Sequence, residues 1–176
     1  MKMQQFRSLI GKLFIGIATT AGLLLVSPER PAVQAAAPVP CEPINTELDG
    51  QLFPCSDSPV GMCAVGTVRT GSLKGSKEAI YLGASFSAGM PNAEPASTLS
   101  YAANQVFRTE KGDLHVSVVG VSDNLRLVFT EVARITGGTG RFTNATGDLF
   151  ISGTLSPDGS GFQSKVSGAI CFDPAR

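Results

Sequence analysis

The stretch that decides the fold reads ITGGTGRFTNATG and covers residues 135–147. Four of its residues are glycine, and it lies between two strand-like segments, 124–135 and 147–155. Glycines this dense at a junction between strands permit positive φ angles and a close approach of backbones. The stretch therefore predicts a bulged corner that joins two β-strands.

Alternation of apolar and polar residues extends from this corner in both directions, and each alternating run is long enough for a strand with one apolar face. The apolar face of the second run is expected to hold Ile80, Leu82 and Ala84, and that of the fifth to begin with Leu125 and Leu127. The runs cover residues 64–68, 80–88, 99–107, 114–118, 125–135, 149–155 and 162–172.

The connectors between these runs have the composition of tight turns. Glycine or an Asp-Gly pair occurs in residues 74–76, 111–113 and 157–161, and residues 122–124 form a polar turn. Short connectors of this kind join neighbouring strands in antiparallel fashion. Seven or eight such strands, with no helices to cover a flat sheet, predict an all-β fold that closes into a barrel or forms a sandwich.

The first 35 residues are typical of a signal peptide. Basic residues at Lys2, Arg7 and Lys12 precede an apolar run over 13–26, which is shorter than the roughly 20 residues of a spanning helix. Small residues around Ala35 predict cleavage there, so the chain is expected to be secreted or periplasmic and to keep no stable membrane anchor.

Cleavage would change the charge of the chain. The full sequence has 14 basic and 14 acidic residues, and the part after residue 35 keeps 10 basic and 13 acidic ones. No basic cluster remains in that part, so nucleic acid is not expected as a partner.

All four cysteines lie after the predicted cleavage site. An even number in an exported chain predicts two disulfides, and three pairings are open. One histidine and an eight-residue step from Cys55 to Cys63 do not make a zinc pattern. We therefore expect neither a metal site nor a cofactor. The cysteines are Cys41, Cys55, Cys63 and Cys171.

The glycine-rich corner resembles the GGTG-[KR]-F…A-x-G signature of dirigent proteins and of allene oxide cyclase-like barrels. The resemblance implies an antiparallel closed barrel of eight strands with a central cavity, in a distant, exported bacterial-type member that could form homo-oligomers. It carries over only residues interpreted as fold residues. They are Gly137, Gly138, Thr139, Gly140, Arg141, Phe142 and Gly147.

With this fold, the chain divides into three parts. Residues 1–35 are the signal peptide, 36–62 an irregular cysteine-containing N-terminal segment without a period, and 63–173 the β-barrel domain. The first and last strands of a closed barrel are neighbours. One disulfide is therefore expected to join Cys171 to one of the other three cysteines.

Few residues are candidates for chemistry. His115, the only histidine, is expected on the outer face, and no nucleophile elbow is present. Glu131 shares an apolar face and is expected inside, where a carboxylate must be hydrogen-bonded or paired. It could hold the fold or serve a ligand, and the structural role is favoured. Tyr101 and Gln105 share a similar face and could line a cavity beside it.

No convergent set of catalytic residues emerges, so no catalytic residue is assigned. The sequence favours an exported, non-enzymatic β-barrel that binds a small apolar ligand or serves as an envelope or extracellular structural module. The alternative is a cofactor-free cyclase or isomerase, or a dirigent-like protein, that acts on a hydrophobic substrate in the barrel cavity.

Overall fold

The computed structural model describes residues 39–86 and 97–172. The predicted signal peptide, residues 1–35, lies outside the described residues. Within those residues, no helix is long and apolar enough to span a membrane. The secondary structure of the described part is almost entirely β. Its elements are β1 (Cys41–Pro54), β2 (Met62–Val68), β3 (Gly75–Phe86), β4 (Thr98–Thr109), β5 (Gly112–Asp123), β6 (Val128–Gly138), the 3-10 turn η1 (Gly140–Phe142), β7 (Ala145–Thr146), β8 (Asp148–Leu155) and β9 (Gly161–Phe172).

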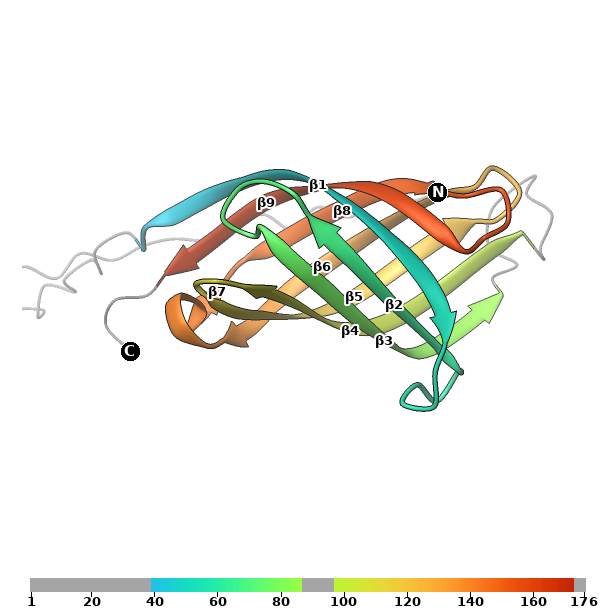
Figure 1. Ribbon diagram of the computed structural model, residues 1–176, viewed down its shortest axis with the longest axis horizontal. Helices are drawn as coiled ribbons and strands as arrows, with labels where there is room; N and C mark the ends of the chain where they lie inside the picture. The colour runs from blue at the N-terminus through green and yellow to red at the C-terminus, as the bar shows by residue number, and fades with distance from the viewer. Residues whose placement is uncertain (1–38, 87–96, 173–176) are drawn as a thin grey trace, which may run out of the picture. The chain divides into compact units, whose positions relative to one another are not determined.

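Eight of these strands form a closed antiparallel barrel (Figure 1). Each strand pairs with the next in the order β1, β2, β3, β4, β5, β6, β8, β9, and the pairing of β1 with β9 closes the ring. The two-residue strand β7 is an addition that pairs with the end of β9. The expected all-β fold, an antiparallel eight-stranded closed barrel, is therefore confirmed.

The expectation of an irregular segment over residues 36–62 is wrong for residues 41–54. These residues form β1, which pairs with β2 on one side and β9 on the other. Ile44, Thr46 and Leu48 are buried on alternate positions, as in any strand with one inner face. Pro43 and Gly50 gave this stretch the composition of a loop, and only two of its three buried alternate residues are aliphatic. The barrel consequently begins at Cys41 rather than at Cys63.

The expected inner face of β3 is also wrong in its first half. Ile80 and Leu82 point outward and are 37% and 46% exposed, whereas Ala79 and Tyr81 are buried. A β-bulge explains the difference, because the pairing with β4 shifts register between Tyr81 and Gly83. The extra residue reverses the alternation, so the inner face continues with Ala84.

The expected start of β6 is wrong as well. Leu125 lies in the turn between β5 and β6 and is 68% exposed, and Leu127 closes that turn with a φ angle of 57°. The Asp123 side chain accepts hydrogen bonds from the backbone N–H groups of Leu125 and Arg126. These side-chain hydrogen bonds satisfy backbone N–H groups of residues 124–127, which therefore form a turn instead of pairing with a neighbouring strand.

The glycine-rich corner forms as predicted. Between β5 and β6, His115 pairs with Gly137 and Val116 with Ile135, which leaves Thr136 as an extra residue in a bulge. Gly137 and Gly140 have φ angles of 130° and 55°, a region that favours glycine. The chain then passes through η1 and β7 into β8, the next strand of the ring.

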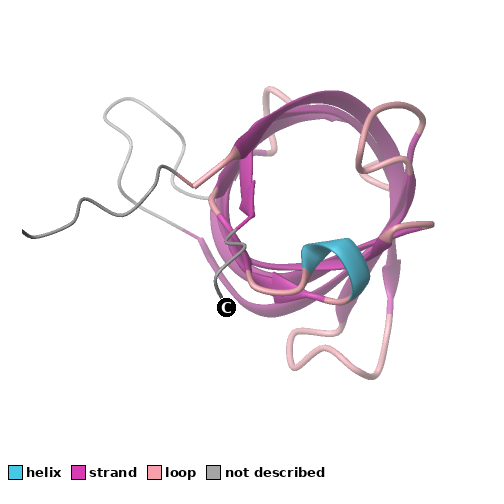
Figure 2. Ribbon diagram, turned by 90° about the vertical axis from the view of Figure 1, so that its left-hand side faces the viewer, coloured by secondary structure: helices cyan, strands magenta, loops and turns pink. Residues whose placement is uncertain are grey.

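The corner lies at one end of the barrel, which we call the closed end (Figure 2 views the barrel from this end). The side chains that fill the barrel here have no exposed surface at all. Phe107 and Leu114 come from the barrel strands, Leu73 from the β2–β3 turn, and Phe142 from η1. These residues form a fully buried apolar plug at the closed end.

Candidate functional site

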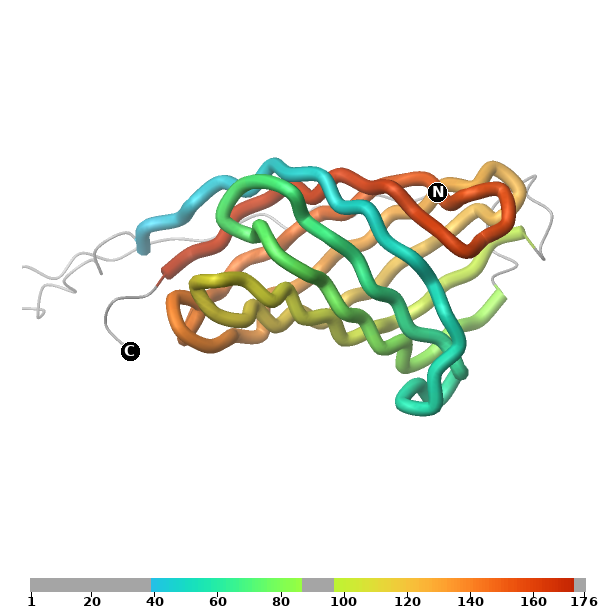
Figure 3. Tube along the Cα trace, viewed as in Figure 1, coloured from blue at the N-terminus to red at the C-terminus, as the bar shows by residue number. Residues whose placement is uncertain are grey.

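The other end of the barrel, which we call the open end, carries a cavity of about 390 Å³. The β1–β2 loop, the β5–β6 turn and the β8–β9 turn surround this end (right-hand side of Figure 3). The cavity wall is mainly apolar and comes from strands around the ring. Its apolar lining residues are Leu52, Met62, Ala84, Leu99, Leu127, Phe129, Leu155, Pro157 and Phe162.

The polar residues predicted for a cavity lie together. Glu131 is 3% exposed. Its two carboxylate oxygens accept hydrogen bonds from the Tyr101 hydroxyl at 2.9 Å and from the Gln105 amide nitrogen at 3.0 Å. Two donors on two oxygens match an ionised carboxylate. Glu131 and Tyr101 line the cavity, whereas Gln105 does not and is 1% exposed.

Gly120 explains why Tyr101 reaches Glu131. Tyr101 pairs with Gly120 across β4 and β5, and Gly120 pairs with Glu131 across β5 and β6. A Cβ atom on Gly120 would lie 2.5 Å from Tyr101 Cζ, so only glycine lets the ring lie across β5. The role of Gly120 was not predicted from the sequence, although a glycine inside an alternating strand is a known sign of close approach.

Lys77 is the second residue whose role was not predicted from the sequence. It lies inside the barrel on β3 and is 2% exposed. Its Nζ lies 5.3 Å from the centroid of the Phe162 ring, and it has no hydrogen-bond or ion-pair partner among the described residues. Burial lowers the pKa of Lys77, and the Glu131 carboxylate partly opposes that shift. Flanking Ser76 and Glu78 gave no apolar alternation that would have placed Lys77 inside.

Two tyrosines stand beside the Glu131 carboxylate. Tyr81 and Tyr101 pack edge to face, with ring centroids 5.3 Å apart. Burial, and secondarily the charge of Glu131, raises the pKa of both phenols above the ordinary value of 10.0. Both hydroxyls therefore keep their protons at neutral pH, so each is able to donate a hydrogen bond and does not act as a base.

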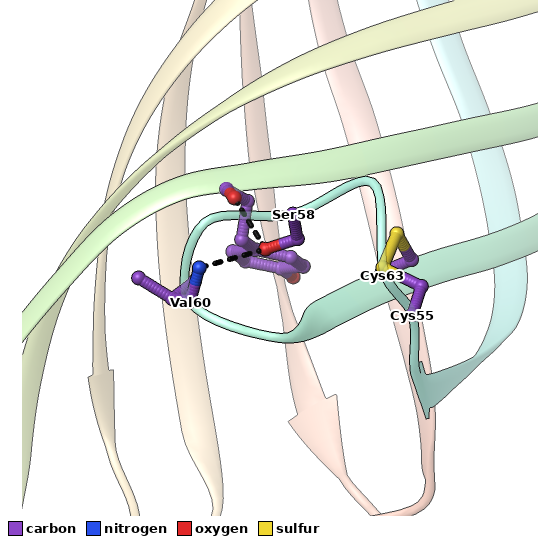
Figure 4. The surroundings of a disulfide bond; sticks show 5 residues. Cys55, Ser58, Val60 and Cys63 are labelled. Atoms are coloured by element: carbon purple, nitrogen blue, oxygen red, sulfur yellow. Dashed lines mark hydrogen bonds between the residues drawn. A yellow bond between two sulfur atoms is a disulfide. The ribbon is translucent and has the colours of Figure 1, made fainter.

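A disulfide and two hydrogen bonds hold the β1–β2 loop in place (Figure 4). Its ends are joined by the disulfide Cys55–Cys63. The buried Ser58 hydroxyl donates to the Tyr81 carbonyl oxygen at 2.6 Å and accepts from the Val60 N–H at 3.2 Å. These bonds attach the loop to the part of β3 that carries the bulge and the cavity residue Tyr81.

The second disulfide is at the opposite end of the barrel. Cys41 and Cys171 face each other on β1 and β9 and are bonded. Two disulfides were predicted, one of them between Cys171 and another cysteine, and both predictions are confirmed. Two disulfides are consistent with an oxidising, extracellular environment.

The cavity is not lined by His115 or by Arg126, Arg134 and Arg141. His115 is exposed on the outer face of β5, as expected. Arg126 and Arg134 are exposed and pair with Asp123 and Asp148. In the signature turn, Arg141 pairs with Glu42 at 2.6 Å and stacks on the Phe172 ring at 4.7 Å. Across residues 39–86 and 97–172, no three metal-ligating side chains cluster together.

Fold and cavity together define a class of protein, a closed antiparallel β-barrel that is plugged at one end and hollow at the other. No family model, curated protein or solved structure matches this chain. Its function must therefore be argued from the geometry and chemistry of the cavity.

Proposed function

We propose that this protein is a non-enzymatic binder of a small, largely apolar molecule, which it holds in the open-end cavity. The observation that carries the proposal is the cavity itself, with a volume of about 390 Å³. This volume falls within the roughly 300–1,000 Å³ of small-molecule sites, which combine apolar walls with a few placed polar groups. Glu131 and Tyr101 are the placed polar groups here.

The two ends of the barrel differ in a way that supports ligand binding over a purely structural role. A structural barrel gains stability by filling its whole interior, because each empty space forfeits dispersion contacts. Here the closed end is filled by side chains with no exposure, such as Phe107 and Phe142, whereas Leu99 and Phe129 at the open end are only half-buried. An apolar ligand would gain about 0.8 kcal/mol for each methylene that it buries there.

The cellular location is part of the same proposal. We propose that residues 1–35 are a cleaved signal peptide and that the mature chain is secreted or periplasmic. The basic start, the apolar run and the small residues before Ala36 support this, and so do the two disulfides. Amino-terminal sequencing of the exported protein should begin near Ala36. An intact Met1 on a membrane-bound product would contradict the cleavage.

A second candidate function is a cofactor-free cyclase or isomerase, as the resemblance to allene oxide cyclase-like and dirigent-like barrels implies. One observation favours it. The Glu131 carboxylate and the Tyr101 hydroxyl lie at the wall of an apolar cavity, where a carboxylate can act as a base. The two candidates differ in one outcome. A binder returns its natural ligand unchanged after incubation, whereas an enzyme converts it.

Binding can be tested with a neutral apolar fluorophore, N-phenyl-1-naphthylamine, titrated into the purified mature protein. We expect saturable fluorescence enhancement from one site. The variant Ala84→Trp places a large ring in the cavity wall and should abolish it. Ser85→Trp is the matched control, because Ser85 is the next residue on β3 and does not line the cavity. Equal binding by both variants would place the probe elsewhere and contradict the proposal.

A further inference from the structure

The charged residues that line the cavity, among those the structure describes, are all acidic. The described residues that line it include two acids, Glu131 and Asp158, and no lysine, arginine or histidine. Asp158 lies in the β8–β9 turn, where hydrogen bonds from Ser156 and Ser160 lower its pKa to about 2. Asp158 is therefore charged at neutral pH. At Glu131, one donor on each oxygen matches an ionised carboxylate, so a ligand in the cavity meets negative charge.

The two carboxylates differ in the hydrogen-bond acceptor capacity that remains for a ligand. Asp158 is occupied by Ser156 and by both the N–H and the hydroxyl of Ser160. From the described residues, Glu131 accepts one bond on each oxygen, and an ionised carboxylate offers about four lone-pair sites. Glu131 thus keeps acceptor capacity at the cavity wall, within an apolar environment that strengthens any bond it makes.

Tyr81 adds a donor next to this acceptor. Its hydroxyl has no hydrogen-bond partner among the described residues, and Tyr81 lines the cavity. The Tyr101 proton is already donated to Glu131. Lys77 does not line the cavity, and its Nζ lies 5.3 Å from the centroid of the Phe162 ring. Among the described residues, the wall therefore offers a charged acceptor and a neutral donor and no cation.

We propose that the open-end cavity selects ligands whose polar end carries a hydrogen-bond donor, a hydroxyl or an amine, and rejects those that end in a carboxylate. This inference rests on the proposed ligand-binding function. A hydroxyl can donate to Glu131 and accept from the Tyr81 hydroxyl, so it satisfies both groups. An amine can do the same, and an ammonium can pair with Glu131. A carboxylate would accept from Tyr81 but face Glu131 with like charge in an apolar site, where repulsion is strong.

Competition against N-phenyl-1-naphthylamine at neutral pH tests the inference with four ligands of one chain length. They are 1-decanol, decylamine, decanoate and methyl decanoate. We expect the alcohol and the amine to displace the probe at least about tenfold more effectively than decanoate. The methyl ester separates the lack of a donor from the like-charge repulsion, since it is uncharged but has no donor. Its ability to displace the probe should fall between those of the alcohol and the acid.

Variants locate the selectivity in Glu131. In Glu131→Gln the like charge is removed, so decanoate should improve relative to decanol until the two differ by less than about threefold. Glu78→Gln is the matched control, because Glu78 is an exposed residue on the outer face of β3 that pairs with Arg108. It should keep the full difference.

The outcomes distinguish this inference from the proposed function. If the probe binds and decanoate competes as well as decanol in the wild-type protein, the selectivity is wrong and ligand binding stands. If the probe does not bind at all, the proposed function fails and the inference fails with it. The four-ligand comparison uses only the wild-type protein, so it decides the matter even if Glu131→Gln does not fold.

Discussion

The closed and open ends of the barrel are built from the same eight strands but are completed in different ways. At the closed end, a glycine corner and η1 bring Phe142 over the barrel interior, and the plug that it completes has no exposed surface. At the open end, the turns stay at the rim, and half-buried residues such as Leu99 surround a cavity. The difference indicates that the closed end contributes more packing stability than the open end, where we propose that a ligand binds.

The two disulfides give the largest contrast between the ends. Cys41–Cys171 spans 130 residues at the closed end, and Cys55–Cys63 spans 8 at the open end. Because loop entropy grows with span, removing the first bridge by a double Cys→Ser change should lower the unfolding free energy by about 5 kcal/mol. Removing the second should cost only about 2.5 kcal/mol. Chemical denaturation measures both losses of unfolding free energy. A larger loss for the short bridge would contradict the prediction that the closed-end disulfide contributes more stability.

Substitution of one apolar residue at each end should show the next largest difference. Phe142→Ala empties a fully buried site and should cost about 3–5 kcal/mol of unfolding free energy. Leu99→Ala removes a half-buried residue of the cavity wall and should cost about 1 kcal/mol, while weakening binding of the probe. Urea titrations of the two variants test this. Equal losses would mean that both ends contribute equally to the free energy of unfolding.

Glu131→Gln tests the polar wall of the cavity. An amide can accept only one of the two bonds that Tyr101 and Gln105 now donate, so unfolding free energy should fall by about 1–3 kcal/mol. The variant also removes the charge that opposes the lowered pKa of Lys77. A folded-state pKa below the unfolded value penalises folding at low pH, and the penalty fades as pH rises towards 10.5.

The deficit of Glu131→Gln should therefore narrow with rising pH in the range below 10.5. Melting curves of wild type and variant across this range provide the measurement. A deficit that stays constant or grows would show that Lys77 is not coupled to Glu131. Thermal stability unchanged at every pH would show that the carboxylate has no structural role.

A glycine from each end gives the smallest contrast. Gly140 at the closed end has a φ angle of 55°, and a Cβ there would lie 2.4 Å from the Lys111 carbonyl oxygen. Gly140→Ala should therefore cost about 1 kcal/mol or more. A Cβ on Gly83, near the open end, would meet no heavy atom within 4 Å, so Gly83→Ala should change stability by less than about 0.5 kcal/mol. Similar melting temperatures for the two variants would count against the strained corner.

The ends also differ in how well the sequence predicted them. The corner at 135–147 was recognisable because glycine density is a local signal. The inner faces of β4, β5 and β9 followed directly from period-two alternation. At β3 the bulge at Leu82 reversed the alternation, and Gly83 beside it is only a weak local sign of such a bulge. In β1 the inner face mixes Thr46 and Gly50 with aliphatic residues, so its pattern was too weak to outweigh loop composition.

The cavity illustrates the same limit. Alternation placed Glu131, Tyr101 and Gln105 on inner faces, and these three side chains do meet. Their contact depends on neighbours across the sheet, because Gly120 leaves the space for the Tyr101 ring. Lys77 enters the barrel only through the register of β3 with β4. Pairing between distant segments of this kind is not predicted by the sequence pattern of any single segment.

The most direct test of the central claim is native mass spectrometry of the mature protein purified from its own host. We predict a species heavier than the disulfide-bonded chain by the mass of one small molecule, which is lost on denaturation. Ser85→Trp should retain that molecule and Ala84→Trp should lose it. A wild-type protein that shows only the bare chain mass, and that also fails to bind N-phenyl-1-naphthylamine, would contradict the claim that the open end is a ligand site.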